Sequence, residues 1–96
     1  MEELSRFDVA AYDSVLMVVV ESDLLPPDPS VVVIPLLLGY PAVRHLNPVI
    51  HHGDQNLVLA TRLITAVRRS GVRRKGSVAD QGDYITRAVD VLMGGV

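Results

Sequence analysis

The sequence contains no cysteine, which excludes disulfide bridges, thiolate nucleophiles and zinc sites built on cysteine, and fits a reducing compartment. It has no tryptophan, one phenylalanine and three tyrosines, so few aromatic side chains can stack on nucleic-acid bases. Positive charge is also scarce, because 9 basic and 11 acidic residues give a formal net charge of -2. The whole-chain balance therefore gives no indication of direct nucleic-acid binding.

Long apolar runs are missing as well. The longest uncharged stretch, residues 29–43, holds three prolines and is shorter than the roughly 20 apolar residues that cross a bilayer. Residues 1–3 are Met, Glu and Glu instead of the basic start of a secretory signal, so we expect a cytoplasmic protein without membrane contact. The 96 residues suffice for one core, and we predict a single domain over residues 1–96. A core this small buries a limited share of the chain, so we also expect oligomerisation.

Alternating or continuous β-branched residues dominate the first two-thirds of the chain, and they predict a mainly β fold. Gly53 and Asp54 predict the turn of a hairpin. Pro35 lies inside the apolar run VVVIPLLL and lacks an N–H group, which predicts an edge strand or a bulge, with a bend. The expected strands are residues 6–12, 15–21, 31–38, 48–52 and 56–61, with a further short strand at 63–67.

The end of the chain has helical periodicity. Its apolar residues recur at i, i+3, i+4 and i+7, and they are Ile85, Ala88, Val89 and Leu92. Asp80 is the expected N-cap, with Asp83 three residues later, and Asp83 can pair with Arg87 on the polar face. Gly94 and Gly95 are expected to end the helix. The fold class is therefore a small β-barrel or twisted sheet with one C-terminal α-helix.

Charge is distributed unevenly along the chain. Residues 1–28 carry seven acids against one base, whereas residues 55–79 carry six bases and no acid. The bases are Arg62, Arg68, Arg69, Arg73, Arg74 and Lys75. This basic segment could bind phosphates or an acidic peptide, or it could be a solvated loop that keeps the protein soluble.

Residues for catalysis are few. His51 and His52 are adjacent, so on a strand they face opposite sides and cannot hold one metal ion together. His45 is a lone loop residue, and no phosphate-loop, zinc-protease or nucleophile-elbow motif occurs. We expect no metal, no cofactor and no catalytic residue. One enzymatic alternative is an RNA endonuclease, for which the available side chains are Thr61, Arg62, Arg68 and His52.

Five segments, in this order and spacing, resemble the CcdB family, the toxin half of a bacterial toxin–antitoxin pair. They are RFDV at 6–9, VVVESDLL at 18–25, VVVIPLL at 31–37, LNPVIHHGD at 46–54 and AVDVLMGGV at 88–96. The resemblance implies an SH3-like barrel with a C-terminal helix, and a homodimer that binds the A subunit of DNA gyrase and traps the enzyme on cleaved DNA. Such a toxin is an inhibitor and not an enzyme itself.

The resemblance also implies two binding surfaces. The antitoxin would be a CcdA-like, acidic and partly disordered peptide, and the complex of toxin and antitoxin would bind operator DNA and repress its own operon. Opposite charge suggests that this peptide binds the basic segment, at Arg62, Arg68, Arg69, Arg73 and Arg74. The residues that map to the gyrase-binding surface are Ser22, Leu24, Leu25, Arg87, Asp90, Met93, Gly94, Gly95 and Val96.

The helix end departs from the family pattern. The best-known members have bulky aromatic residues there, including a tryptophan central to gyrase binding, whereas this chain has Met93 and Gly94. Loss of a buried tryptophan anchor typically costs several kcal/mol of binding free energy. Weak or absent inhibition is therefore one expected outcome. It leaves open a third hypothesis, a non-toxic homologue that binds only the antitoxin and takes part in operon autoregulation.

Overall fold

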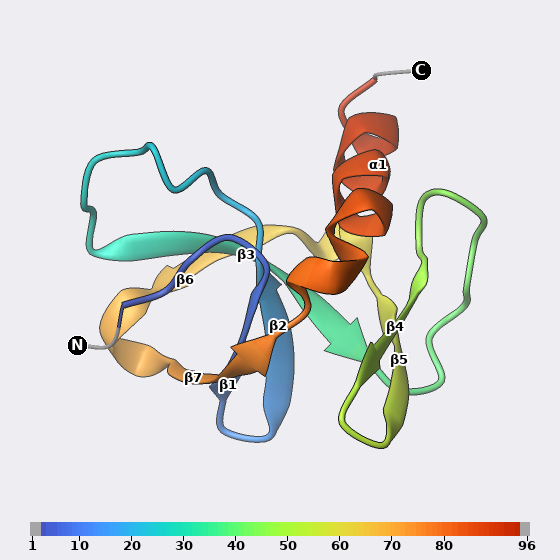
Figure 1. The fold of residues 1–96 in the computed structure, drawn as a ribbon, viewed down its shortest axis with the longest axis horizontal. Coiled ribbons are helices and arrows are strands. Elements are labelled where there is room, and N and C mark those ends of the chain that lie inside the picture. Colours follow the sequence, from blue (N-terminus) through green and yellow to red (C-terminus); the bar gives the residue numbers. More distant parts are fainter. Residues whose placement is uncertain (1–2, 95–96) are drawn as a thin grey trace.

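The computed structural model describes residues 3–94, which form seven strands, three short 3-10 turns and one α-helix (Figure 1). The strands are β1 (Asp8–Tyr12), β2 (Val15–Val19), β3 (Ser30–Leu37), β4 (Val49–His52), β5 (Gln55–Leu59), β6 (Thr65–Arg68) and β7 (Arg73–Ser77). The 3-10 turns are η1 (Thr61–Leu63), η2 (Arg69–Gly71) and η3 (Ala79–Gln81), and the helix is α1 (Gly82–Leu92). Every strand expected from the sequence has a counterpart here, whereas β7 was not predicted.

The strands form one antiparallel sheet in the order β4-β5-β3-β2-β1-β7, and β6 pairs with β3 outside this path. The long strand β3 therefore takes part in both halves of the sheet. Its first half pairs with β6, from Ser30 to Val33, and its end pairs with β5, at Leu36 and Leu37. The sheet curls as a result, which confirms a mainly β fold with a C-terminal helix and is consistent with an SH3-like barrel.

Pro35 lies in a central strand, so the predictions of an edge strand and of a bulge are both wrong. On one side it pairs with Met17 of β2, in a register without a shift. On the other side its carbonyl accepts a hydrogen bond from the Ala60 N–H at 2.9 Å. That side is where β3 changes partner from β6 to β5, so no strand needs the N–H that proline lacks. Figure 1 shows β3 changing direction along its length, as the predicted bend requires.

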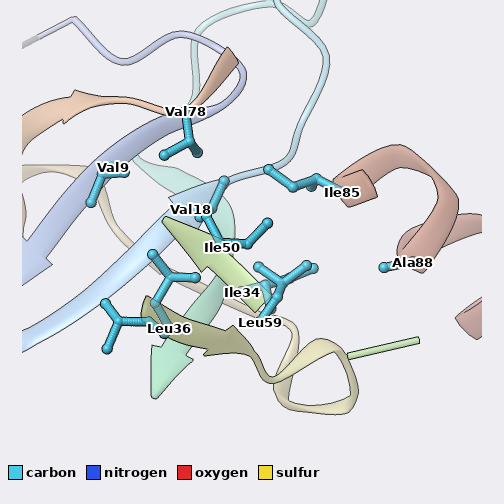
Figure 2. Close-up of a cluster of buried hydrophobic side chains, with 10 residues drawn as sticks. Val9, Val18, Ile34, Leu36, Ile50, Leu59, Val78, Ile85 and Ala88 are labelled. Carbon is cyan, nitrogen blue, oxygen red and sulfur yellow. The ribbon is translucent and has the colours of Figure 1, made fainter. Parts of the chain in front are cut away.

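A cluster of buried aliphatic side chains lies between the sheet and α1 (Figure 2). The helix contributes Ile85 and Ala88, and both are fully buried. Figure 2 shows these two side chains directed toward the strands. The strand and loop members of the cluster are Val9, Val18, Ile34, Leu36, Ile50, Leu57, Leu59 and Val78. The predicted apolar stripe of the helix therefore attaches it to the sheet.

The start of α1 differs from the prediction that Asp80 is its N-cap. Asp80 lies within η3, and Gln81 occupies the N-cap position without a side-chain capping bond. The Gln81 side chain instead accepts a hydrogen bond from the His51 N–H and donates one to the His51 carbonyl, both at 2.8 Å. The Gln81 side-chain amide therefore makes the backbone hydrogen bonds that a neighbouring strand would otherwise make at the outer edge of β4.

Two glycines fit the ends of α1. A Cβ atom on Gly82 would lie 2.7 Å from the Phe7 ring, so the first turn of the helix can approach the N-terminal segment only with glycine there. At the other end Gly94 has a φ of 90°, which confirms it as a helix stop. Gly95 lies outside the described residues. The predicted pair of Asp83 and Arg87 is not among the ion pairs that the structure shows within residues 3–94.

Thr61 is a buried polar residue and carries a stability prediction. Its hydroxyl donates a hydrogen bond to the Leu46 carbonyl, and its N–H donates one to Asn47 Oδ1. Thr61→Val keeps the shape but leaves the Leu46 carbonyl without this donor, which should cost about 1–3 kcal/mol of unfolding free energy. Urea denaturation measures the loss. The exposed Thr65→Val is the matched control and should change little, so equal effects of the two variants would contradict this role.

Candidate protein-docking surface

Residues 20–29 form a loop that exposes two leucines. Leu24 is 94% exposed and Leu25 is 55% exposed. Ser22 shapes the loop, because its hydroxyl accepts a hydrogen bond from the Leu24 N–H and its carbonyl accepts one from the Leu25 N–H. Large apolar side chains held outward on an ordered loop are typical of contact sites for another protein. These three residues, predicted for a gyrase-binding surface, therefore lie together in one exposed turn.

The described end of α1 is also open to solvent. Met93 is 74% exposed, and nothing lies within 4 Å of the position that a Gly94 side chain would occupy. Figure 1 shows the end of α1 pointing away from the sheet, on the same side of the molecule as the 20–29 loop. Gly95 and Val96, which belong to the same predicted surface, lie outside the described residues. We call the exposed turn 22–25 and the end of α1 together the docking face.

The outer face of α1 borders a groove of about 460 Å³. Arg87 and Asp90, both predicted for the surface, line it, and so does His45 from the loop after β3. Desolvation, and after it the nearby Arg87 guanidinium, lowers the pKa of His45 below its ordinary value. No local pattern predicted that His45 lies beside the helix, because its position depends on the path of the loop after β3.

Arg6 connects the exposed turn to the middle of α1. Its N–H donates a hydrogen bond to Asp23 Oδ1 at 2.8 Å, and its guanidinium donates one to Thr86 Oγ1 at 3.2 Å. The same guanidinium lies over the Phe7 ring, 4.7 Å from its centroid. One residue thus connects the 20–29 loop to α1. Sequence reasoning did not identify Arg6, because its partners are 17 and 80 residues away in the chain.

The bases of the basic segment are spread over η1, β6, η2 and β7. Arg62 lies in η1, before β6, and Arg68 is the last residue of β6. This strand of four residues spans about 13 Å. Arg69 and Arg74 form ion pairs with Glu21 and Asp8, at 3.2 and 3.1 Å. The remaining basic side chains, which are exposed, are Arg62, Arg68, Arg73 and Lys75.

The side chains considered for RNA cleavage do not form a site. Thr61 is fully buried, so its hydroxyl is not accessible to a substrate. Arg62 and Arg68 are separated by β6, and His52 lies against Gly76 of β7. Within residues 3–94 no three His, Asp or Glu side chains gather so that they could hold a metal ion. The same part of the chain contains no helix with the length and apolar character needed to cross a bilayer.

The comparison with known families supports the resemblance inferred from the five segments of the sequence. A family model described as CcdB protein matches residues 6–95, nearly the whole chain. The match includes the exposed turn 22–25, the basic segment and α1. No curated protein gives a significant sequence match.

Proposed function

The chain belongs to the CcdB family of toxins from toxin–antitoxin pairs, and on this premise we propose that it binds the A subunit of DNA gyrase and poisons the enzyme. The observation that carries the proposal is the exposed pair Leu24 and Leu25 on an ordered turn, within the matched residues. Exposed leucines next to a free helix end suit an inhibitor that acts by binding. The proposed location is the cytoplasm, where gyrase works.

A homodimer is part of the proposal. A two-fold assembly that pairs the ends of two α1 helices presents a symmetric surface, which matches an enzyme whose own subunits are related by a two-fold axis. Leu24, Leu25 and Met93 would supply apolar contact, while Arg87 and Asp90 would supply polar contacts beside it. Binding would hold gyrase on cleaved DNA, and the chain itself would make or break no covalent bond.

The test is inhibition of gyrase by the purified protein. We expect loss of supercoiling activity at micromolar concentrations, because two leucines without a tryptophan anchor provide limited binding energy. Expression of the chain without its antitoxin should arrest growth. Normal supercoiling at high micromolar protein, together with normal growth, would contradict the proposed toxicity.

A second candidate function is favoured by Met93 and Gly94. The absence of aromatic side chains at these positions fits a homologue that binds the antitoxin without acting on gyrase. Tight antitoxin binding together with unimpeded growth would support this candidate over gyrase poisoning. In either case we propose that operator DNA is bound only by the complex with the antitoxin.

The antitoxin contact is proposed for the basic segment, and it carries a prediction. The proposed acidic antitoxin peptide should bind Arg62, Arg68 and Arg73, with smaller contributions from the already paired Arg69 and Arg74. The double variant of Arg68→Ala and Arg73→Ala should weaken binding of a synthetic copy of that peptide about tenfold at low salt. The effect should shrink at high salt, because salt screens exposed charges. Fluorescence titration measures both affinities.

The control for this prediction is Arg44→Ala, which removes an exposed arginine outside the basic segment. This variant should bind the peptide as the unchanged protein does. About threefold weakening by Arg44→Ala, which is half the expected free-energy loss for one charge instead of two, would mean that net charge alone attracts the peptide, and this would contradict a site on the basic segment.

A further inference from the structure

Arg69 connects the two ends of the 20–29 loop. Its guanidinium donates hydrogen bonds to Glu21 Oε2 at 3.2 Å, to the Asp28 carbonyl at 3.1 Å and to the Ser30 carbonyl at 3.3 Å. Its N–H donates a further bond to the Pro29 carbonyl at 2.7 Å. Glu21 lies where the loop begins, and residues 28–30 lie where it ends. One side chain therefore closes the loop.

The contacts of Arg69 are shielded from water. The side chains of Arg69 and Glu21 are only 15% and 16% exposed, so their ion pair is less screened than a surface pair. Glu21 is fixed in turn, because its second oxygen accepts a hydrogen bond from the Val32 N–H at 3.0 Å. At the other end, the Ser30 hydroxyl and N–H both donate to Asp28 and lower the pKa of that carboxyl group. Each end of the loop is thus tied to β3.

The loop has little other support. Residues 20–29 contain no strand or helix, and most of them are exposed. Within residues 3–94, the hydrogen bonds that the structure shows for the middle of the loop are those of the turn at Ser22 and the bond from Arg6 to Asp23. A loop that binds through exposed leucines loses conformational entropy on binding unless it is ordered beforehand. A residue that orders the free loop therefore raises affinity without touching the partner.

We propose that Arg69 is a positioning residue of the docking face, which holds Leu24 and Leu25 in their binding arrangement by joining Glu21 to residues 28–30. The proposal rests on the proposed binding of the gyrase A subunit. It also separates Arg69 from its neighbours in the basic segment. Arg69 acts within the chain, whereas the exposed Arg68 is free to face a partner.

Hydrogen exchange in the purified free protein tests the positioning itself. Arg69→Ala should raise the exchange rates of the Leu24 and Leu25 amides about tenfold, because both amides donate within the turn, while core amides such as Val18 should not change. Glu21→Gln removes the ion pair with less disturbance and should give a smaller increase at the same amides. The matched control is Lys75→Ala, which removes an exposed cation on β7 and should leave the loop unchanged.

Affinity for the purified gyrase A subunit is the second readout. Arg69→Ala should weaken binding about tenfold, and Arg69→Lys should restore part of the loss because it keeps the charge. The double variant of Glu21→Gln and Arg69→Ala should bind no worse than Arg69→Ala alone, because both changes break the same ion pair between Arg69 and Glu21.

The outcomes separate this inference from the proposed function. Unchanged loop exchange in folded Arg69→Ala would overturn the positioning role, and so would equal loss of affinity in Lys75→Ala. If Arg69→Ala does not fold, the exchange rates of Glu21→Gln decide, and unchanged rates would overturn the role. If the unaltered protein does not bind the gyrase A subunit, the proposed function fails, while the exchange rates still decide whether Arg69 orders the loop.

Discussion

Leu24→Asp should reduce affinity for the gyrase A subunit by a factor of about 30 or more and leave the melting temperature unchanged. The side chain is 94% exposed, so its replacement removes no packing from the folded protein. In the proposed complex the same side chain is covered by the partner, where a carboxylate would be buried without a hydrogen-bond partner. The prediction therefore separates binding from stability at a single position.

The matched control is Leu38→Asp. Leu38 is also a strongly exposed leucine, 76% accessible, but it follows β3 and is not part of the docking face. Titration of each variant against the gyrase A subunit, with thermal unfolding in parallel, makes the comparison. Equal loss of affinity in the two variants would show that the partner does not use the exposed turn. Loss of stability in Leu24→Asp would show that this side chain packs within the protein.

Ile85→Ala should lower the unfolding free energy by about 2–5 kcal/mol. Ile85 is fully buried and belongs to the cluster between α1 and the strands (Figure 2). Truncation leaves a cavity at the contact that attaches the helix to the sheet, and a domain of this size has only a few kcal/mol of stability in reserve. We therefore expect a large decrease in melting temperature, or a chain that is largely unfolded at 37 °C.

Tyr84→Ala controls for the helix itself, because Tyr84 precedes Ile85 on α1 and faces solvent. Both substitutions introduce alanine at neighbouring helical positions, so helix propensity changes little between them. Urea denaturation of the two variants isolates the contribution of burial. A loss below about 1 kcal/mol for Ile85→Ala would mean that α1 is not attached through this cluster, and would contradict the described packing.

The main elements of the fold could be predicted because their apolar side chains form continuous runs or recur with helical spacing. The run from Val31 to Leu38 and the helical spacing from Ile85 to Leu92 both have this property, and both elements are confirmed. Strand β7 could not be predicted, since RRKGS exposes almost all of its side chains and has no apolar face. It is a strand because β1 supplies backbone partners, which no local pattern indicates.

Two local predictions failed because tertiary contacts decide them. Asp80 has the right chemistry for an N-cap, but η3 shifts the start of α1 to Gly82, and Gln81 is engaged with His51. Pro35 has the chemistry of an edge residue, but the change of partner along β3 leaves its missing N–H without consequence. In both cases the deciding contact joins segments far apart in sequence.

The candidate site was predicted only in part. The resemblance placed Ser22, Leu24 and Leu25 on one binding surface, and the structure shows them together in one exposed turn. The residues that hold this turn, Arg6 and Arg69, were not identified for this role. Their partners lie 17, 80 and 48 residues away, so nothing in the local sequence links them to the loop. The local positive charge of the basic segment suggested that Arg69 binds the antitoxin, and the structure shows that its guanidinium also makes three hydrogen bonds within the chain.

The most direct measurement of the central proposal is a DNA-cleavage assay with purified gyrase, ATP and supercoiled plasmid. The account predicts that linear DNA accumulates with increasing protein, only when gyrase is present, and that Leu24→Asp abolishes this while Leu38→Asp does not. Absence of linear DNA at high micromolar protein would contradict the account. Cleavage of total RNA by the protein alone would contradict it equally, because the polypeptide would then be an enzyme.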